Sequence, residues 1–298
     1  MPAACPIEWA PVHPSPQPKM NLLKPLKLLL LAATLVLGGC ASTNYGDEQY
    51  RLRMAIAGKD IIWVPSKLDM VHKMLDAARV TRQDIVYDLG SGDGIIPIEA
   101  ARKYGVRAVG IEYNPDLVAL SQRNAKRAQL EALVSFKRGD IFVEDFSEAT
   151  VVTLYLGEAL NAKLMPRLLA MRPGTRVVSN IFRIESWTPD QVIRSESGEQ
   201  AYLWTVPARI EGRWSFAGAP ELPNLSMQVR QKKQFFDAQI FAGGTRIALT
   251  EDSKINGNRI SLDFARGSVR YQLQGEVQGQ RFTGLLNGTV PVTGTLSP

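Results

Sequence analysis

The segment Asp88-Leu89-Gly90-Ser91-Gly92-Asp93-Gly94 closes an apolar run that starts at Asp84 and is predicted to be a buried strand. The residues that follow, from Ile95 to Lys103, are predicted to form a helix. Glycine has no side chain, so the backbone of such a loop can approach a ligand closely and, with the helix N-terminus, point its amide groups toward it. Strand, loop and helix together predict a mononucleotide-binding unit of an α/β fold with a parallel sheet.

The spacing of the glycines argues against a dinucleotide cofactor. In the fingerprint Gly-x-Gly-x-x-Gly, the third glycine lets the helix pack closely against the strand. Counted from Gly90 and Gly92, that position is occupied by Ile95, whose branched side chain would obstruct the packing. The loop therefore fails the dinucleotide motif, although it keeps a carboxylate, Asp88, two residues before its first glycine.

Two further acids stand at the ends of the next two predicted strands. Val106–Glu112 ends in Glu112, and the third strand, Val134–Gly139, is followed by Asp140. One acid at a strand end is usually a helix cap or a solvated side chain, but three in succession beside a glycine loop favour a ligand site. Because the carboxyl ends of parallel strands meet at one edge of a sheet, we expect Asp88, Glu112 and Asp140 to line a common site.

This set of residues resembles motif I and the following strand ends of class I S-adenosylmethionine (SAM)-dependent methyltransferases. The resemblance implies a Rossmann-like sheet with flanking helices and SAM as the cofactor. It places Asp88 near the methionine amino group, Glu112 at the ribose hydroxyls and Asp140 at the adenine amino group, with Ile141 and Phe142 on either side of the ring. The predicted cofactor-binding residues are Asp88, Gly90, Ser91, Gly92, Asp93, Gly94, Glu112, Tyr113, Asp140 and Ile141.

The fourth predicted strand, Ala149–Leu156, ends where the methyl acceptor lies in this fold. Tyr155 is expected either to wall the acceptor site or simply to pack, and both interpretations stay open. Residues 158–169 are predicted to form an amphipathic helix that is interrupted at Pro166. Asn180, at the end of the fifth strand, is a second candidate for orienting the acceptor. We assign Tyr155 and Asn180 as the candidate catalytic residues. The Asn-Pro-Pro-Tyr signature of amide and adenine N-methyltransferases is absent, which disfavours DNA and glutamine as acceptors.

A closer resemblance covers residues 60–206. Trp63-Val64-Pro65-Ser66, Thr150–Leu156 and Trp187-Thr188-Pro189-Asp190 are similar to stretches in the protein-lysine methyltransferases of the mitochondrial ATP synthase c subunit and adenine nucleotide translocase, and in their bacterial relatives. The resemblance implies N-methylation of a protein lysine by in-line methyl transfer. We assign Trp63 and Pro65 to the substrate side. Ser66 and Asp69 are spaced as a capping box for a helix whose buried face is predicted to carry Leu68, Val71, Leu75 and Ala78.

Composition excludes several other classes of enzyme. The two cysteines, Cys5 and Cys40, precede the predicted domains, and His13 and His72 are the sole histidines. A disulfide framework, a thiolate or histidine metal site and Ser-His-Asp hydrolysis are therefore disfavoured, and we expect no metal. The net charge is +6, but the basic residues are scattered without interleaved aromatic residues, so no nucleic acid is expected as a partner.

Residues 1–40 are predicted to be a leader. A proline-rich stretch is followed by Met20, which we take as the true start, then by a basic segment and the apolar run Leu28–Leu37. Leu37-Gly38-Gly39-Cys40 resembles the bacterial lipobox and predicts lipidation of Cys40, hence a membrane-anchored lipoprotein of the cell envelope. Ala41 after the cysteine favours the outer membrane. The alternative, a transmembrane anchor, is disfavoured because the run is too short to span a bilayer.

The rest of the chain divides into three predicted parts. Residues 41–59 form a linker, 60–207 the methyltransferase domain and 208–298 a β-rich domain. In the last part, short alternating segments and the turn Asn256-Gly257 predict a meander of roughly eight strands, closed as a small barrel or packed as a sandwich. Its role, whether recruiting a substrate or stabilising the chain, is left open.

The leader raises a question about function. A lipoprotein faces the periplasm, where SAM is not expected to be supplied. One alternative is therefore a non-enzymatic envelope lipoprotein that uses the methyltransferase fold to bind a ligand or partner. Another is retention in the cytoplasm. The complete motif set at Asp88, Gly90, Gly92, Glu112 and Asp140 favours the enzyme.

Overall fold

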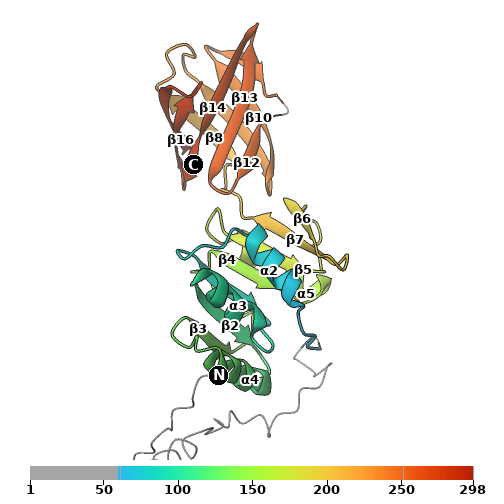
Figure 1. Cartoon of the computed structure of the whole chain (residues 1–298). Coiled ribbons are helices and arrows are strands. Elements are labelled where there is room, and N and C mark those ends of the chain that lie inside the picture. Colours follow the sequence, from blue (N-terminus) through green and yellow to red (C-terminus); the bar gives the residue numbers. More distant parts are fainter. Residues whose placement is uncertain (1–59, 61, 251, 298) are drawn as a thin grey trace, which may run out of the picture. The chain divides into compact units, whose positions relative to one another are not determined.

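The computed structural model describes residues 60, 62–250 and 252–297. The predicted leader with Cys40 and the predicted linker lie outside the described residues. Within them the chain forms a mixed sheet with flanking helices and a separate antiparallel sheet (Figure 1). The predicted fold class, a Rossmann-like sheet followed by an all-β region, is confirmed.

The first sheet has seven strands in the described part of the chain, in the order β3-β2-β1-β4-β5-β7-β6. The first five strands are parallel, whereas β7 runs antiparallel to β5 and β6 antiparallel to β7. The order reverses between β1 and β4, and this switch point opens a crevice at the carboxyl ends of the strands. The strands are β1 (Ile85–Leu89), β2 (Arg107–Glu112), β3 (Val134–Arg138), β4 (Val151–Leu154), β5 (Arg176–Asn180), β6 (Gln191–Arg194) and β7 (Gln200–Thr205).

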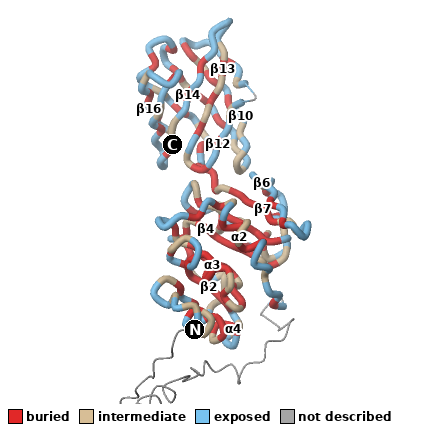
Figure 2. Tube along the Cα trace, in the orientation of Figure 1, coloured by how far each residue is buried: buried red, intermediate tan, exposed pale blue. Residues whose placement is uncertain are grey.

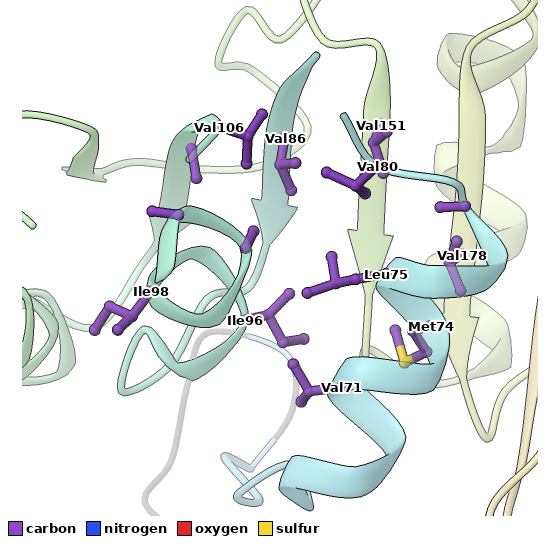
Figure 3. Packing of buried hydrophobic residues seen from close by; sticks show 14 of the residues in the cluster. Val71, Met74, Leu75, Val80, Val86, Ile96, Ile98, Val106, Val151 and Val178 are labelled. Atoms are coloured by element: carbon purple, nitrogen blue, oxygen red, sulfur yellow. The ribbon is translucent and has the colours of Figure 1, made fainter. Parts of the chain in front are cut away.

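Helices cover both faces of this sheet. Side chains alternate between the faces of a strand, so each strand feeds two cores. One core joins the strands to α2 (Leu68–Ala77), α3 (Ile95–Tyr104) and α4 (Pro115–Arg127). Figure 3 shows part of it, with side chains of α2 and α3 directed at the strands. The other core packs α5 (Glu158–Leu169) on the opposite face. Buried residues accordingly run along the strands in Figure 2.

Two local predictions about helices are wrong. Helix α2 begins at Leu68 with Lys67 at the N-cap, and no side chain caps it, so Ser66 is one residue too early for the expected capping box. Leu68 is correspondingly exposed instead of lying on the buried face. Helix α5 was expected to be interrupted at Pro166 but continues through it. Pro166 lies on the exposed side of α5, while buried side chains on the other side hold the helix to the sheet.

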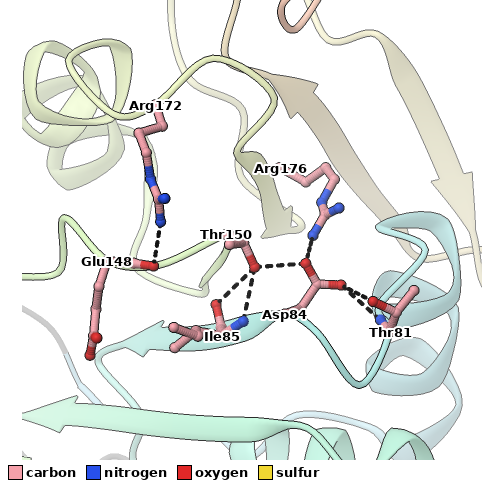
Figure 4. Close-up of polar contacts among 7 residues, drawn as sticks. All are labelled: Thr81, Asp84, Ile85, Glu148, Thr150, Arg172 and Arg176. Atoms are coloured by element: carbon pink, nitrogen blue, oxygen red, sulfur yellow. Dashed lines mark hydrogen bonds and ion pairs between the residues drawn. The ribbon is translucent and has the colours of Figure 1, made fainter.

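A polar cluster ties together the amino ends of β1, β4 and β5 (Figure 4). The Asp84 carboxylate accepts hydrogen bonds from Thr150 Oγ1 at 2.7 Å and from the Thr81 backbone N–H at 2.8 Å, and it pairs with Arg176. Burial alone would raise the pKa of Asp84, but these partners outweigh it and hold the pKa below its ordinary value. The cluster lies at the edge of the sheet opposite the glycine loop and is therefore structural.

The second sheet is a closed up-and-down barrel. Strand β8 (Gly212–Ala217) pairs with β9 and with the last strand, β16 (Val290–Ser297). The other end of the sheet closes through a bridge between Leu249 and Phe264. The strands between are β9 (Ser226–Lys232), β10 (Phe235–Ala242), β11 (Thr245–Ala248), β12 (Lys254–Asn256), β13 (Arg259–Arg266), β14 (Val269–Gln278) and β15 (Arg281–Leu286).

Of the two predicted arrangements of this region, a barrel and a sandwich, the structure has the barrel. Its described strands number nine, against the roughly eight predicted. The predicted hairpin at Asn256-Gly257 joins β12 to β13, with Gly257 at a φ of 59°. Large buried side chains, among them Trp214, Phe264 and Phe282, fill the interior. The barrel is thus a packed core.

Candidate cofactor and acceptor site

A cavity of about 480 Å³ opens at the carboxyl edge of the first sheet. It lies at the switch point between β1 and β4, where this fold binds ligands. Most of the predicted site residues line it, namely Trp63, Asp88, Gly90, Ser91, Asp93, Glu112, Tyr113, Asp140, Ile141 and Tyr155. The structure does not place the remaining predicted residues in its lining, namely Pro65, Gly92, Gly94 and Asn180.

The glycine loop is fitted tightly between its neighbours. The backbone N–H groups of Gly90 and Ser91 both donate to the carbonyl of Ile111, at 2.8 and 3.1 Å, which fixes the loop to the end of β2. Gly92 and Gly94 have φ of 53° and 83°. A Cβ at Gly92 would overlap the Trp63 indole, and one at Gly94 would overlap buried side chains. These two glycines shape the loop without lining the cavity.

Glu112 holds the glycine loop in place. One carboxylate oxygen accepts the backbone N–H of Gly92 at 3.0 Å, and the other accepts that of Asn114 at 2.8 Å. The side chain is buried and also lines the cavity. A carboxylate offers about four acceptor positions, so capacity for ribose hydroxyls remains beside these two bonds. Its contact with the ribose stays a prediction.

Asp88 is the most deeply buried acid of the cavity, with 3% of its surface exposed. Thr153 Oγ1 donates a hydrogen bond to it at 2.6 Å. Burial raises the pKa of Asp88 to about 7, the Thr153 hydrogen bond opposes this, and the charges of Glu112 and Asp93 add to it. A cation placed beside Asp88 would relieve this unfavourable ionisation.

The loop that follows β3 carries Asp140 and Ile141 into the cavity. Asp140 Oδ1 accepts the backbone N–H of Phe142 at 2.9 Å. Ile141 and Phe142 both pack in part against the core under α5, and of the two only Ile141 also lines the cavity. The expected enclosure of the adenine ring by both side chains stays a prediction.

Trp63 belongs to the cofactor end of the cavity. Its indole lies over Gly92 and forms a small buried cluster with Leu117 and Leu120 of α4. The segment before α2 therefore covers the glycine loop. Pro65 is exposed. The assignment of Trp63 and Pro65 to the substrate side stays a prediction, and the packing of Trp63 favours a contact with the cofactor.

Tyr155 and Phe182 form an aromatic wall at the other end of the cavity. Their ring centroids lie 6.0 Å apart, tilted by 34°, and both side chains are partly buried. Burial, with a smaller contribution from the charge of Glu199, raises the pKa of Tyr155, so its phenol is neutral at physiological pH. Phe182 was not predicted from the sequence because no motif marks it.

Asn180 precedes Phe182 by two residues. It is buried at the end of β5, does not line the cavity, and its Oδ1 has no hydrogen-bond partner among the described residues. Beyond it, Ile181 has a φ of 61°, which is unusual for a β-branched residue. Asn161 of α5 donates to the carbonyl of Phe182 at 3.2 Å and holds the turn. Asn180 takes part in this turn through its backbone carbonyl, which accepts the Phe182 N–H at 2.6 Å.

The charged side chains that line the cavity are all acidic. Within the described residues the lining contains five charged groups, Asp60, Asp88, Asp93, Glu112 and Asp140, and no lysine or arginine. Such a cavity favours cationic ligands. No three His, Cys, Asp or Glu side chains of the described ranges gather as ligands of a metal ion. No helix in the same ranges is long and apolar enough to cross a bilayer.

Comparison with known proteins agrees with this site. The ANTKMT methyltransferase domain matches residues 88–191. A protein-lysine N-methyltransferase of Saccharolobus islandicus is 41% identical over 149 residues, which are 48% of this chain and 92% of the relative. The chain belongs to the protein-lysine N-methyltransferase family. This methyltransferase therefore uses SAM.

Two further similarities were found. The mouse lysine N-methyltransferase of the ATP synthase c subunit is 32% identical over 158 residues, 53% of this methyltransferase and 63% of the mouse protein. A solved structure described as an RNA methyltransferase from Salinibacter ruber in complex with S-adenosyl-L-homocysteine is 49% identical, with a TM-score of 0.48. That match covers 49% of this chain and 96% of the other. All three similarities thus extend over about half of the chain.

Proposed function

We propose that this methyltransferase transfers the methyl group of SAM to the Nζ of a lysine in a protein substrate. The observation that carries the proposal is the wholly acidic set of charged residues in the cavity. SAM brings a sulfonium and an ammonium, and a lysine acceptor arrives as an ammonium, so each reactant is attracted to the same carboxylates. The named activities of the archaeal and mouse relatives support a lysine acceptor.

The residues would share the binding of SAM along the strand ends. Asp88 would pair with its amino group, Glu112 with the ribose hydroxyls and Asp140 with the adenine amino group. Bound in this way, SAM supplies a methyl group on a positively charged sulfur. The lysine Nζ would first give one proton to solvent, and its freed lone pair would then form the new N–C bond as the C–S bond breaks, with the electrons of that bond staying on sulfur.

Tyr155 and Phe182 would align the acceptor. In-line transfer needs the nucleophile held close to the methyl carbon and shielded from water more than it needs a strong base. Two adjacent aromatic rings form a wall along which the aliphatic stem of a lysine can pack, and they attract its charged end by cation–π interaction.

The mouth of the cavity suggests what surrounds the target lysine. Ile62, Val64 and Tyr113 line the cavity yet expose 55%, 45% and 47% of their surfaces. Exposed apolar side chains at a ligand site are typical of a docking surface. We therefore propose that the acceptor lysine is flanked by apolar residues.

We also propose that the methyltransferase is anchored at the cell envelope through a lipid on Cys40. The pattern from Met20 to Cys40 supports this, with its basic segment, short apolar run and lipobox-like end. Replacing Cys40 by serine should then move the protein from the membrane fraction to the soluble fraction. An unchanged membrane fraction would contradict the lipid anchor.

The experiment for the activity is methyl transfer from radiolabelled SAM into envelope extract. We expect label that is released by protease but resists ribonuclease, with methyl-lysine identified by mass spectrometry. Asp88→Ala should abolish it, whereas Glu131→Ala, which removes an exposed acid that does not line the cavity, should not. Label sensitive to ribonuclease, or retained in Asp88→Ala, would contradict the proposal.

A further inference from the structure

The loop between β3 and β4 is shaped by its own hydrogen bonds. We call residues 140–146 the adenine loop, after the proposed contact of Asp140. The backbone N–H groups of Val143 and Glu144 both donate to the carbonyl of Asp140 at 2.8 Å. These bonds fix the curvature of the loop, but they do not attach it to the sheet, because none of its residues belongs to a strand.

Arg167 of α5 attaches the adenine loop to the domain. Its Nη1 donates to the carbonyl of Ile141 at 2.7 Å, and its Nη2 donates to the carbonyl of Glu144 at 2.7 Å. The guanidinium also lies over the Phe146 ring, 4.4 Å from its centroid. The rigid, planar fork of arginine can engage two carbonyls and a ring face at once, which an ammonium cannot do.

Lys163 adds a second contact from the same face of the helix. It precedes Arg167 by four residues, one helical turn, and its Nζ lies 3.9 Å from the centroid of the Phe142 ring. Leu160, a further turn toward the start of α5, lines the cavity. One helix therefore carries both a wall of the cavity and the clamp on the adenine loop.

We infer that Arg167 is a positioning residue: it holds the adenine loop at the distance from the glycine loop that adenine recognition requires. It acts through Ile141 and Asp140 without lining the cavity itself. The inference rests on the proposed function, because it takes the adenine to lie against this loop. Without the fork, the loop loses its fixed distance from the glycine loop, and its own hydrogen bonds open more often.

The test compares the binding of two probes to the full chain by calorimetry, S-adenosyl-L-homocysteine and its inosine analogue, S-inosyl-L-homocysteine. The variants are Arg167→Gln and Arg167→Lys, and the matched control is Arg172→Gln. Arg172 also donates to one backbone carbonyl of this connection, that of Glu148 at 3.1 Å, outside the adenine loop (Figure 4).

We expect Arg167→Gln to weaken binding of the adenosyl probe about tenfold to a hundredfold, as for two lost charge-assisted hydrogen bonds. The preference for adenine over hypoxanthine should fall with it. Arg167→Lys should show a smaller loss of affinity and of adenine preference. If Arg167→Gln does not fold, the Arg167→Lys variant alone tests the inference. Faster hydrogen exchange at Val143 and Glu144 should accompany the loss, and Arg172→Gln should resemble the wild type.

Three results would overturn the inference. One is unchanged affinity in both Arg167 variants, and another is equal weakening of both probes, which would indicate a purely structural role. The third is a loss in Arg172→Gln as large as in Arg167→Gln. Failure of the wild type itself to bind the adenosyl probe would instead refute the proposed cofactor site.

Discussion

Replacing Asp88 by Asn is expected to remove most of the pH dependence of cofactor binding. In the free protein the pKa of Asp88 is raised to about 7, chiefly by burial. A bound ammonium favours the ionised carboxylate, so binding must first remove a proton whenever the pH is below 7. For a single site, the affinity of the wild type should then be about eightfold higher at pH 7.5 than at pH 6.

The same burial sets the sign of the effect on stability. Because the folded pKa of Asp88 lies above its ordinary value of 3.8, the free protein loses stability as the pH rises from about 4 to about 7, and the loss stays constant above that. The difference corresponds to at most about 4 kcal/mol. Asp88→Asn should therefore raise the melting temperature at pH 8 but not at pH 4, while it weakens cofactor binding.

The assay is calorimetry with S-adenosyl-L-homocysteine at pH 6 and pH 7.5, with thermal melts of the same samples. The Asn variant keeps an oxygen that can accept the Thr153 hydroxyl, so it is close to isosteric. The reasoning would be refuted if the wild type bound equally well at both pH values. A melting temperature lowered at pH 8 in Asp88→Asn would refute it as well.

Three further outcomes follow from other parts of the structure. Gly92→Ala should abolish cofactor binding, because the new Cβ overlaps Trp63, and the added change Trp63→Ala should restore part of it in a double-mutant cycle. Arg176→Met should lower the free energy of unfolding by about 2 to 4 kcal/mol at pH 7 in urea titrations, since it leaves the buried Asp84 without its cation. This deficit should shrink as the pH falls below 4, where the stabilisation from a lowered pKa disappears. Tyr155→Ala should raise the KM for the protein acceptor, with little change in cofactor affinity, and an equal loss of both would contradict an acceptor role.

Features that are local in the sequence were predicted well. The glycine loop needs positive φ and close contacts at Gly92 and Gly94, and only glycine meets those needs, so the chain itself marks them. The acids at strand ends were brought to one cavity because parallel strands share an edge. These inferences depend on the regularity of the fold and not on details of packing.

Features that depend on distant packing were not predicted. Phe182 and Arg167 act through contacts with segments 27 and 26 residues away, at Tyr155 and Ile141, and no motif surrounds either residue. Ser66 was expected to cap α2, but it lies one residue before the N-cap and lines the cavity instead. Strand β16 contains Pro291 and Gly294, which weaken a strand pattern in the sequence, yet pairing with β15 and β8 holds it.

The double role of Glu112 has a consequence for altering the enzyme. The same carboxylate that fixes Gly92 also faces the cavity where the ribose is proposed to lie. A change of Glu112 would therefore alter both the shape of the glycine loop and the recognition of the ribose. A variant built to accept a bulkier or differently substituted methyl donor must replace the hydrogen bond to Gly92 from elsewhere before Glu112 can be changed. Donor specificity in this chain would have to be redesigned as a loop and an acid together.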